Sequence, residues 1–171
     1  VLVSPVKVVQ TLFTVIFDPD YLKTVWYSAA RILGGFFTAL TLGTVLGWIA
    51  SRFWVVETLL RPITAVIKAT PVASFIILVL LWFSGKNLSV IISMLMVFPV
   101  IYMNVLEGIR SADEKLLEMA QVFRLSVSKK LLYIYLPAVA PFFVSACSVS
   151  LGLSWKSGIA AEVIGTPDGS I

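Results

Sequence analysis

The uncharged stretch NLSVIISMLMVFPVIYMNVL, residues 87–106, decides the fold class. It has 20 consecutive residues without a charge, which is about the length that an α-helix needs to cross the hydrocarbon core of a bilayer. Similar runs occur at residues 32–51, 69–85 and 131–155. We therefore expect an all-α, polytopic membrane protein with four transmembrane helices. Their expected bounds are about 28–51, 63–84, 87–106 and 133–155.

The composition agrees with a membrane protein and excludes several other classes. Apolar residues make up 59% of the chain and charged residues 13%, against about 45–50% and about 25% in soluble domains. Histidine is absent and Cys147 is the single cysteine, so the chain offers no Cys/His metal site and no Ser-His or Cys-His catalytic pair. We expect Cys147 to be a packing residue.

The distribution of lysine and arginine predicts the orientation. Eight basic residues lie in the segments 52–68 and 107–130, which the positive-inside rule places in the cytoplasm. Because this rule also accounts for the net charge of +4, we expect lipid and not nucleic acid as the partner of these charges. Residues 1–23 then form an extracytoplasmic or interfacial segment. Residues 24–171 form the membrane domain, which we expect to be incomplete at both ends, and residues 156–171 lie outside.

Small residues in the first expected span recur at every fourth position. Such a stripe lets a second helix approach closely, but it does not tell whether that helix belongs to this chain or to another. The four residues are Gly35, Ala39, Gly43 and Gly47. Arg31 lies near the outer end of the same span, where it either anchors the helix through a structural pair or contacts a translocated anion.

The loop 107–130 is long for a connection between spans, and it predicts a short amphipathic helix. Ser111 and Glu114 match a capping box, which starts a helix over about residues 112–124. The apolar positions that follow are Leu116, Leu117, Ala120 and Phe123. Such a helix buries its apolar face either on the membrane surface or in a groove of a cytoplasmic partner.

One spaced motif in this loop resembles a known family. Glu118-Met119-Ala120 is followed after three residues by Arg124, and after nine more by Ile134-Tyr135-Leu136-Pro137. This is similar to the coupling loop of binding-protein-dependent ABC importer permeases, whose pattern is Glu-Ala-Ala, three residues, Gly, nine residues, Ile-x-Leu-Pro. All intervals match. Met119 and Arg124 depart from the pattern, and Arg124 stands where the family has a glycine that allows a turn.

Other parts of the chain are similar to the nitrate, sulfonate and taurine type of these permeases, over about residues 20–170. Arg31 with the following Gly-rich helix, Leu60-Arg61-Pro62, and Gly152 to Lys156 carry this likeness. It implies four core helices of a type I ABC importer permease plus a cytoplasmic coupling helix, in the bacterial inner membrane. Full-length relatives have six spans, so we expect this chain to be a fragment.

The resemblance implies a non-enzymatic permease subunit that forms the pathway for a small solute, such as the anions nitrate, sulfonate, taurine or bicarbonate. The chain has no phosphate-binding Gly-x-x-x-x-Gly-Lys-[Ser/Thr] motif, so a cytoplasmic ABC ATPase would bind ATP, and we expect no cofactor or metal here. The other implied partners are a second permease copy, as a homodimer, and an extracytoplasmic substrate-binding protein. The alternative is an ATP-independent channel or secondary transporter, which would be expected to carry buried ionisable residues in its spans.

The resemblance also suggests roles for individual residues. Glu118 either pairs with a basic residue of the ATPase or is a solvated helix charge. The expected coupling residues are Leu117, Glu118, Ala120, Phe123, Arg124, Ile134, Leu136 and Pro137. Lys156 and Glu162 either pair with each other or line an outer gate, and Arg31 is the third candidate for this gate or pathway.

Overall fold

The computed structural model describes residues 18–83 and 85–166, together with residues 4, 7, 11, 15 and 16. Every regular element in these ranges is helical. The elements are α2 (Pro19–Arg52), α3 (Trp54–Ala69), α4 (Val72–Trp82), a 3₁₀ turn (Gly85–Asn87), α5 (Leu88–Arg110), α6 (Glu114–Val122), α7 (Val127–Lys130), a π-helical turn (Leu131–Tyr135) and α8 (Leu136–Gly165). Most of the segment expected at 1–23 lies outside the described residues.

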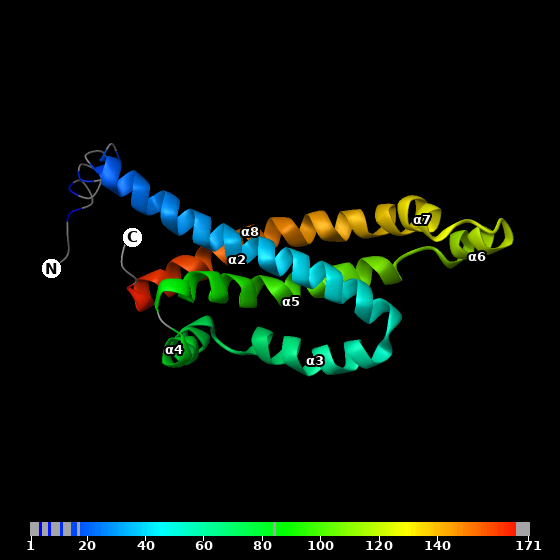
Figure 1. The fold of residues 1–171 in the computed structure, drawn as a ribbon, viewed down its shortest axis with the longest axis horizontal. Coiled ribbons are helices and arrows are strands. Elements are labelled where there is room, and N and C mark those ends of the chain that lie inside the picture. The colour runs from blue at the N-terminus through cyan, green and yellow to red at the C-terminus, as the bar shows by residue number, and fades with distance from the viewer. Residues whose placement is uncertain are drawn as a thin grey trace.

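Helix α2 is longer than the span predicted at 28–51. It begins at Pro19, where the Asp18 carboxylate accepts a hydrogen bond from the Asp20 amide at 3.1 Å, and proline is well tolerated at the first helical position. Its 34 residues give a length of about 51 Å at 1.5 Å per residue, well beyond the thickness of a bilayer core. The first turns of α2 therefore extend past the other long helices, as Figure 1 shows.

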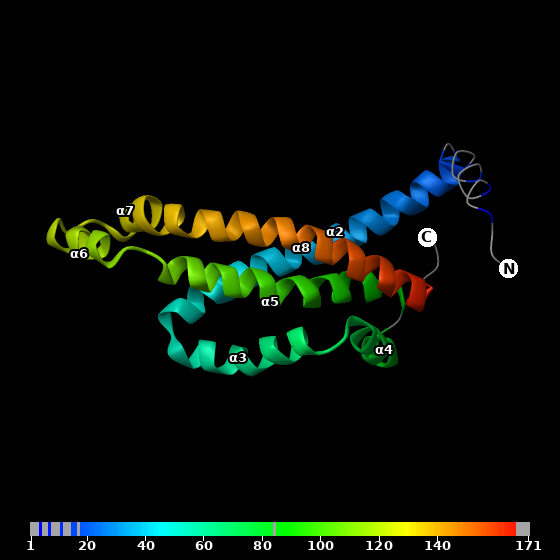
Figure 2. The same ribbon diagram turned by 180° about the vertical axis from the view of Figure 1, so that it is seen from behind.

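The core is a bundle of α2, α5 and α8, with α5 packed against both of the others (Figures 1 and 2). Here the small residues of α2 lie against α5 of the same chain. A Cβ atom at Gly35 would lie 2.5 Å from the carbonyl oxygen of Val90, and one at Gly43 would lie 2.9 Å from Ile101. Ala39 between them is fully buried. The stripe thus sets the distance between these two helices.

The span predicted at 63–84 is not one continuous helix. Helices α3 and α4 meet at an angle of 109°, and the break lies between Ala69 and Val72. Pro71 explains it, because proline has no amide donor and forces the preceding Thr70 into an extended conformation, with ψ of 134°. Helix α4 has 11 residues and is too short to cross a bilayer alone. In the described residues three helices are long and apolar enough to span, or four if this bent pair is one span.

The last helical segment is longer than the span predicted at 133–155. It runs without interruption from Val127 to Gly165, so residues 156–165, which we expected on the outer side of the membrane beyond the span, continue the same helix. The π-helical turn at Leu131–Tyr135 lies within it, and the amide of Leu136 donates to the carbonyl of Leu131. This change of hydrogen bonding comes one residue before Pro137, which has no amide to donate.

Candidate functional site

Helix α6 lies at the opposite end of the molecule from the start of α2, beyond the last turn of α5 (Figure 1). Its N-cap is Asp113, whose carboxylate accepts from the Lys115 amide at 2.9 Å. The capping box predicted on Ser111 is wrong, since the Ser111 hydroxyl instead donates to the carbonyl of Gly108 at the end of α5. An aspartate at the N-cap satisfies the same orphan amides, so α6 still begins close to the predicted position.

Arg124 adopts the conformation that the family pattern assigns to glycine. Its φ of 49° lies in the left-handed region. The amide of Leu125 donates to the carbonyl of Ala120 at 2.9 Å, and the amide of Arg124 donates to that of Gln121 at 3.0 Å. These two bonds form a Schellman motif, which ends α6 and turns the chain toward α7. The turn is therefore made without glycine, at a cost of roughly 1–2 kcal/mol for the left-handed residue.

One face of α6 is buried against its own chain. Ala120 is fully buried and packs with Ile134 of the π-helical turn and with Ala112. Partly buried residues surround this contact, namely Leu117, Leu125, Tyr135 and Ala138. Ala120 and Ile134 are thus buried within the chain and Leu117 is partly buried, and the contact with an ATPase expected for these three residues stays a prediction. They hold α6 on the segment that leads into α8.

The opposite face of α6 is apolar and exposed. Val122 is 80% exposed and Phe123 69%, and Leu116 and Met119 are also exposed. We call these four residues the outer face of α6. Of the residues predicted to contact a partner, Phe123 belongs to this face. Glu118 on α6 is also exposed, as are Leu136 and Pro137 at the start of α8. Leu116, Met119 and Val122, which we did not predict as contact residues, are exposed on the same side of the helix, as their spacing of three residues indicates.

At the other end of the bundle, Arg31 joins three elements. Its guanidinium lies 3.8 Å from the carboxylate of Glu162 on α8 and 3.4 Å from the carbonyl oxygen of Gly85. It also lies 5.4 Å from the centre of the Tyr27 ring. Glu162 is 2% exposed. The pair between Lys156 and Glu162 is not formed, because Lys156 is exposed on α8 while Glu162 points into the bundle.

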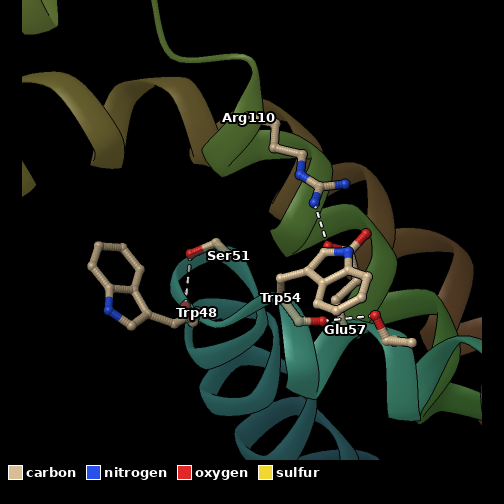
Figure 3. A network of polar contacts seen from close by, with 6 residues as sticks. Trp48, Ser51, Trp54, Glu57 and Arg110 are labelled. Atoms are coloured by element: carbon tan, nitrogen blue, oxygen red, sulfur yellow. Dashed lines mark hydrogen bonds and ion pairs between the residues drawn. The ribbon is translucent and has the colours of Figure 1, made fainter.

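A second ion pair lies at the end of the bundle where α5 ends. Figure 3 shows Arg110, the last residue of α5, extending toward Glu57 of α3, and the two atoms that meet are 2.5 Å apart. The same view shows Trp54, which precedes Glu57 by three residues at the start of α3. The two residues are 53 positions apart in sequence, and no local pattern predicts their contact. The described residues contain no group of three or more acidic or cysteine residues that could hold a metal ion.

Comparison with known proteins agrees with this architecture. A sequence profile of the family described as "Binding-protein-dependent transport system inner membrane component" matches residues 39–170. The chain belongs to this family. It is a multi-pass membrane protein, and its helices α5 to α8, with α6 between two spans, all lie in the matched part.

Several curated relatives are similar over nearly the whole chain. The putative aliphatic sulfonates transport permease protein SsuC of Bacillus subtilis is 30% identical, over 99% of this chain and 62% of the relative. The taurine transport system permease protein TauC of Escherichia coli is 25% identical, over 96% of this chain and 62% of the relative. The nitrate import permease protein NrtB of Leptolyngbya laminosa is 27% identical, over 94% of this chain and 61% of the relative. The chain thus spans about three-fifths of the length of these relatives.

Proposed function

We propose that this chain is the core of a permease subunit in an ATP-driven import system, and that it forms part of the pathway for a small solute. The permease relatives carry the names of sulfonate, taurine, bicarbonate and nitrate transport systems, which supports a small anion as the solute. The observation that carries the proposal is the two-sided packing of α6. One face is fixed to the chain's own helices and the other is apolar and open to a partner.

The coupling would work through this two-sided helix. A cytoplasmic ABC ATPase would receive the outer face of α6 in a groove, where buried aromatic and aliphatic side chains such as Phe123 supply most of the affinity. When the ATPase changes shape, it displaces α6. The displacement passes through Ala120 and Ile134 into α8, which packs along α5. Through such a rigid connection, closure of the ATPase on ATP would make the helical bundle rock.

Two further partners belong to the proposal. Three or four spans are too few to enclose a route, so a second permease copy would complete it, as a homodimer. An extracytoplasmic binding protein would deliver the solute to the end of the bundle that carries Arg31 and Glu162. Lys156, Arg31 and Glu162 stay candidates for an outer gate. In this arrangement Arg31 is already paired with Glu162, which favours a structural over a solute-binding role for it.

The test is co-purification of the full-length permease with the ATPase of its own system. Phe123→Glu places a charge on the outer face, and Gln121→Glu places the same charge two residues away, which is about 200° around the helix. We expect Phe123→Glu to lower the recovered ATPase at least tenfold with unchanged permease in the membrane, and Gln121→Glu to have little effect. Equal recovery from both variants would contradict the proposal. It would then favour the alternative, an ATP-independent channel or secondary transporter.

A further inference from the structure

Helix α3 has its polar residues on the side that borders α5, where Arg61 and Lys68 stay exposed and Thr64 is buried. Glu57, Arg61, Thr64 and Lys68 follow one another at helical spacing and line the space between α3 and α5. On the outside, the exposed apolar residues are Val55, Leu59, Ile63 and Val66. A surface helix of a soluble protein has the reverse arrangement. In a membrane, an inward polar face marks a helix that borders a water-filled route.

The space between the two helices holds a pocket of about 440 Å³. Its walls are Arg61, Thr64, Ala65, Lys68 and Ala69 of α3, and Met103 of α5. Since a water molecule occupies about 30 Å³ of liquid, this pocket has room for a small ion with part of its hydration shell. It adjoins a smaller pocket of about 120 Å³ that reaches Glu57 and Arg110.

The larger pocket has two positive charges on its walls and no negative one. Among the described residues Arg61 forms no ion pair, and the Lys68 ammonium contacts only the Met103 sulfur at 3.4 Å, which is a weak acceptor. Glu57, the nearest carboxylate on α3, is already bonded to Arg110. The walls of the larger pocket therefore carry a net positive charge, and the carboxylates of Glu57 and Glu107 lie on the smaller pocket beside it.

From this arrangement we propose that Arg61 and Lys68 form a binding subsite for a small oxyanion on the cytoplasmic side of the pathway. The inference rests on the proposed function and assigns the chemical class of the solute at a specific place. The anionic head group of a lipid offers the same chemistry. Both side chains line the pocket while staying exposed, and the exposed apolar residues of α3 lie outside it, which favours a soluble anion. A planar guanidinium with an ammonium two turns away suits an ion with several oxygens.

The experiment measures the charge selectivity of labelling inside the pocket. In the full-length permease, Ala65→Cys is made in a Cys147→Ser background and reconstituted in inside-out vesicles of neutral lipid. Labelling rates are compared for two methanethiosulfonate reagents, one bearing a sulfonate and one a trimethylammonium group, each normalised to a free thiol. We expect the anionic reagent to be favoured by about tenfold, because a cleft lined by one sign of charge concentrates the opposite ion.

Matched variants make the result specific. Adding Arg61→Gln and Lys68→Gln should bring the ratio to about 1, whereas Arg52→Gln, at an exposed arginine that does not line the pocket, should leave it unchanged. Nitrate, sulfate or methanesulfonate should slow the labelling at an ionic strength held constant with gluconate. Ala69→Cys provides a second probe in the same wall if Ala65→Cys assembles poorly.

Several outcomes would overturn the inference. Equal rates for the two reagents, an unchanged ratio in the Gln variants, or no labelling at either position would each do so. Protection only in vesicles that contain phosphatidylglycerol would assign the charges to lipid. Co-purification of the ATPase from the same preparations reports on the proposed function separately. Its loss with retained charge selectivity would reject the importer assignment but not the anion site.

Discussion

The guanidinium of Arg31 on α2 lies 3.8 Å from the carboxylate of Glu162, near the end of α8. The pair joins residues 131 positions apart, and the bond from Arg31 to the Gly85 carbonyl adds the turn that precedes α5. Three segments are thus tied together at one charged side chain. Glu162 is almost completely buried, so this carboxylate depends on Arg31 for its neutralisation.

The losses from removing Arg31 and Glu162 should not be additive, because each single variant leaves an unpaired charge and the double variant leaves none. Arg31→Met or Glu162→Leu leaves one buried charge without its partner, at a cost of roughly 3–5 kcal/mol in the free energy of unfolding. The double variant should lose clearly less than the sum of the two. Thermal unfolding of the purified permease, followed by tryptophan fluorescence, measures this. Lys156→Met is the control and should change little, since Lys156 is exposed and unpaired in the described chain. Strictly additive losses would show that the pair contributes nothing.

The close approach of α2 and α5 predicts a sharp difference between adjacent glycines. At Gly35 an added methyl group would lie 2.5 Å from the backbone oxygen of Val90, and at Gly34 it would meet nothing within 4 Å. Gly35→Ala should therefore lower the stability by about 1–3 kcal/mol. Gly34→Ala should leave it unchanged or raise it by up to about 1 kcal/mol through helix propensity. Denaturation of both variants in the same detergent decides between this account and one in which the glycines only reflect membrane composition.

The left-handed conformation of Arg124 predicts a stabilising substitution. Arg124→Gly removes the steric cost of a positive φ and should stabilise the end of α6 by about 1 kcal/mol. Arg124→Val should destabilise it, because a β-branched residue tolerates this region poorly. Hydrogen exchange at the amide of Leu125, which donates to Ala120 across the turn, gives the measurement. Slower exchange in the glycine variant is expected, and equal exchange in all three proteins would refute the Schellman turn.

The sequence predicted the helical class and the long spans because uninterrupted apolar runs depend only on local composition. The run at 69–85 was misleading, although its break was visible in principle. Counting charges overlooks proline, and Thr70-Pro71 cannot continue a helix. The continuation of α8 past residue 155 was missed for a related reason. A glutamate such as Glu162 is expected outside the membrane unless a buried partner is known, and its partner Arg31 is distant in the sequence.

Less of the candidate site than of the fold could be predicted from local sequence. The short helix predicted between two spans is confirmed as α6, because its cap and apolar positions lie close together in the sequence, and the coupling role that the motif implies stays a prediction. The motif could not tell the inner face of α6 from the outer one, since apolar residues occupy both sides of this short helix. The choice depends on Ile134, which is 14 positions beyond Ala120 and packs against it only after the Arg124 turn. The polar face of α3 was equally hidden, because residues 52–62 were expected in a cytoplasmic loop and only the end of α3 in a straight span.

The central claim, that the outer face of α6 contacts an ATPase, is tested most directly by photo-crosslinking. Benzoylphenylalanine is placed at Phe123 in the full-length permease, and at Leu33, an exposed apolar position of the first long helix, as a control. The account predicts that position 123 captures the nucleotide-hydrolysing subunit of the same system and that position 33 does not. Failure of position 123 to capture this subunit in an assembled, ATP-hydrolysing complex would contradict the account.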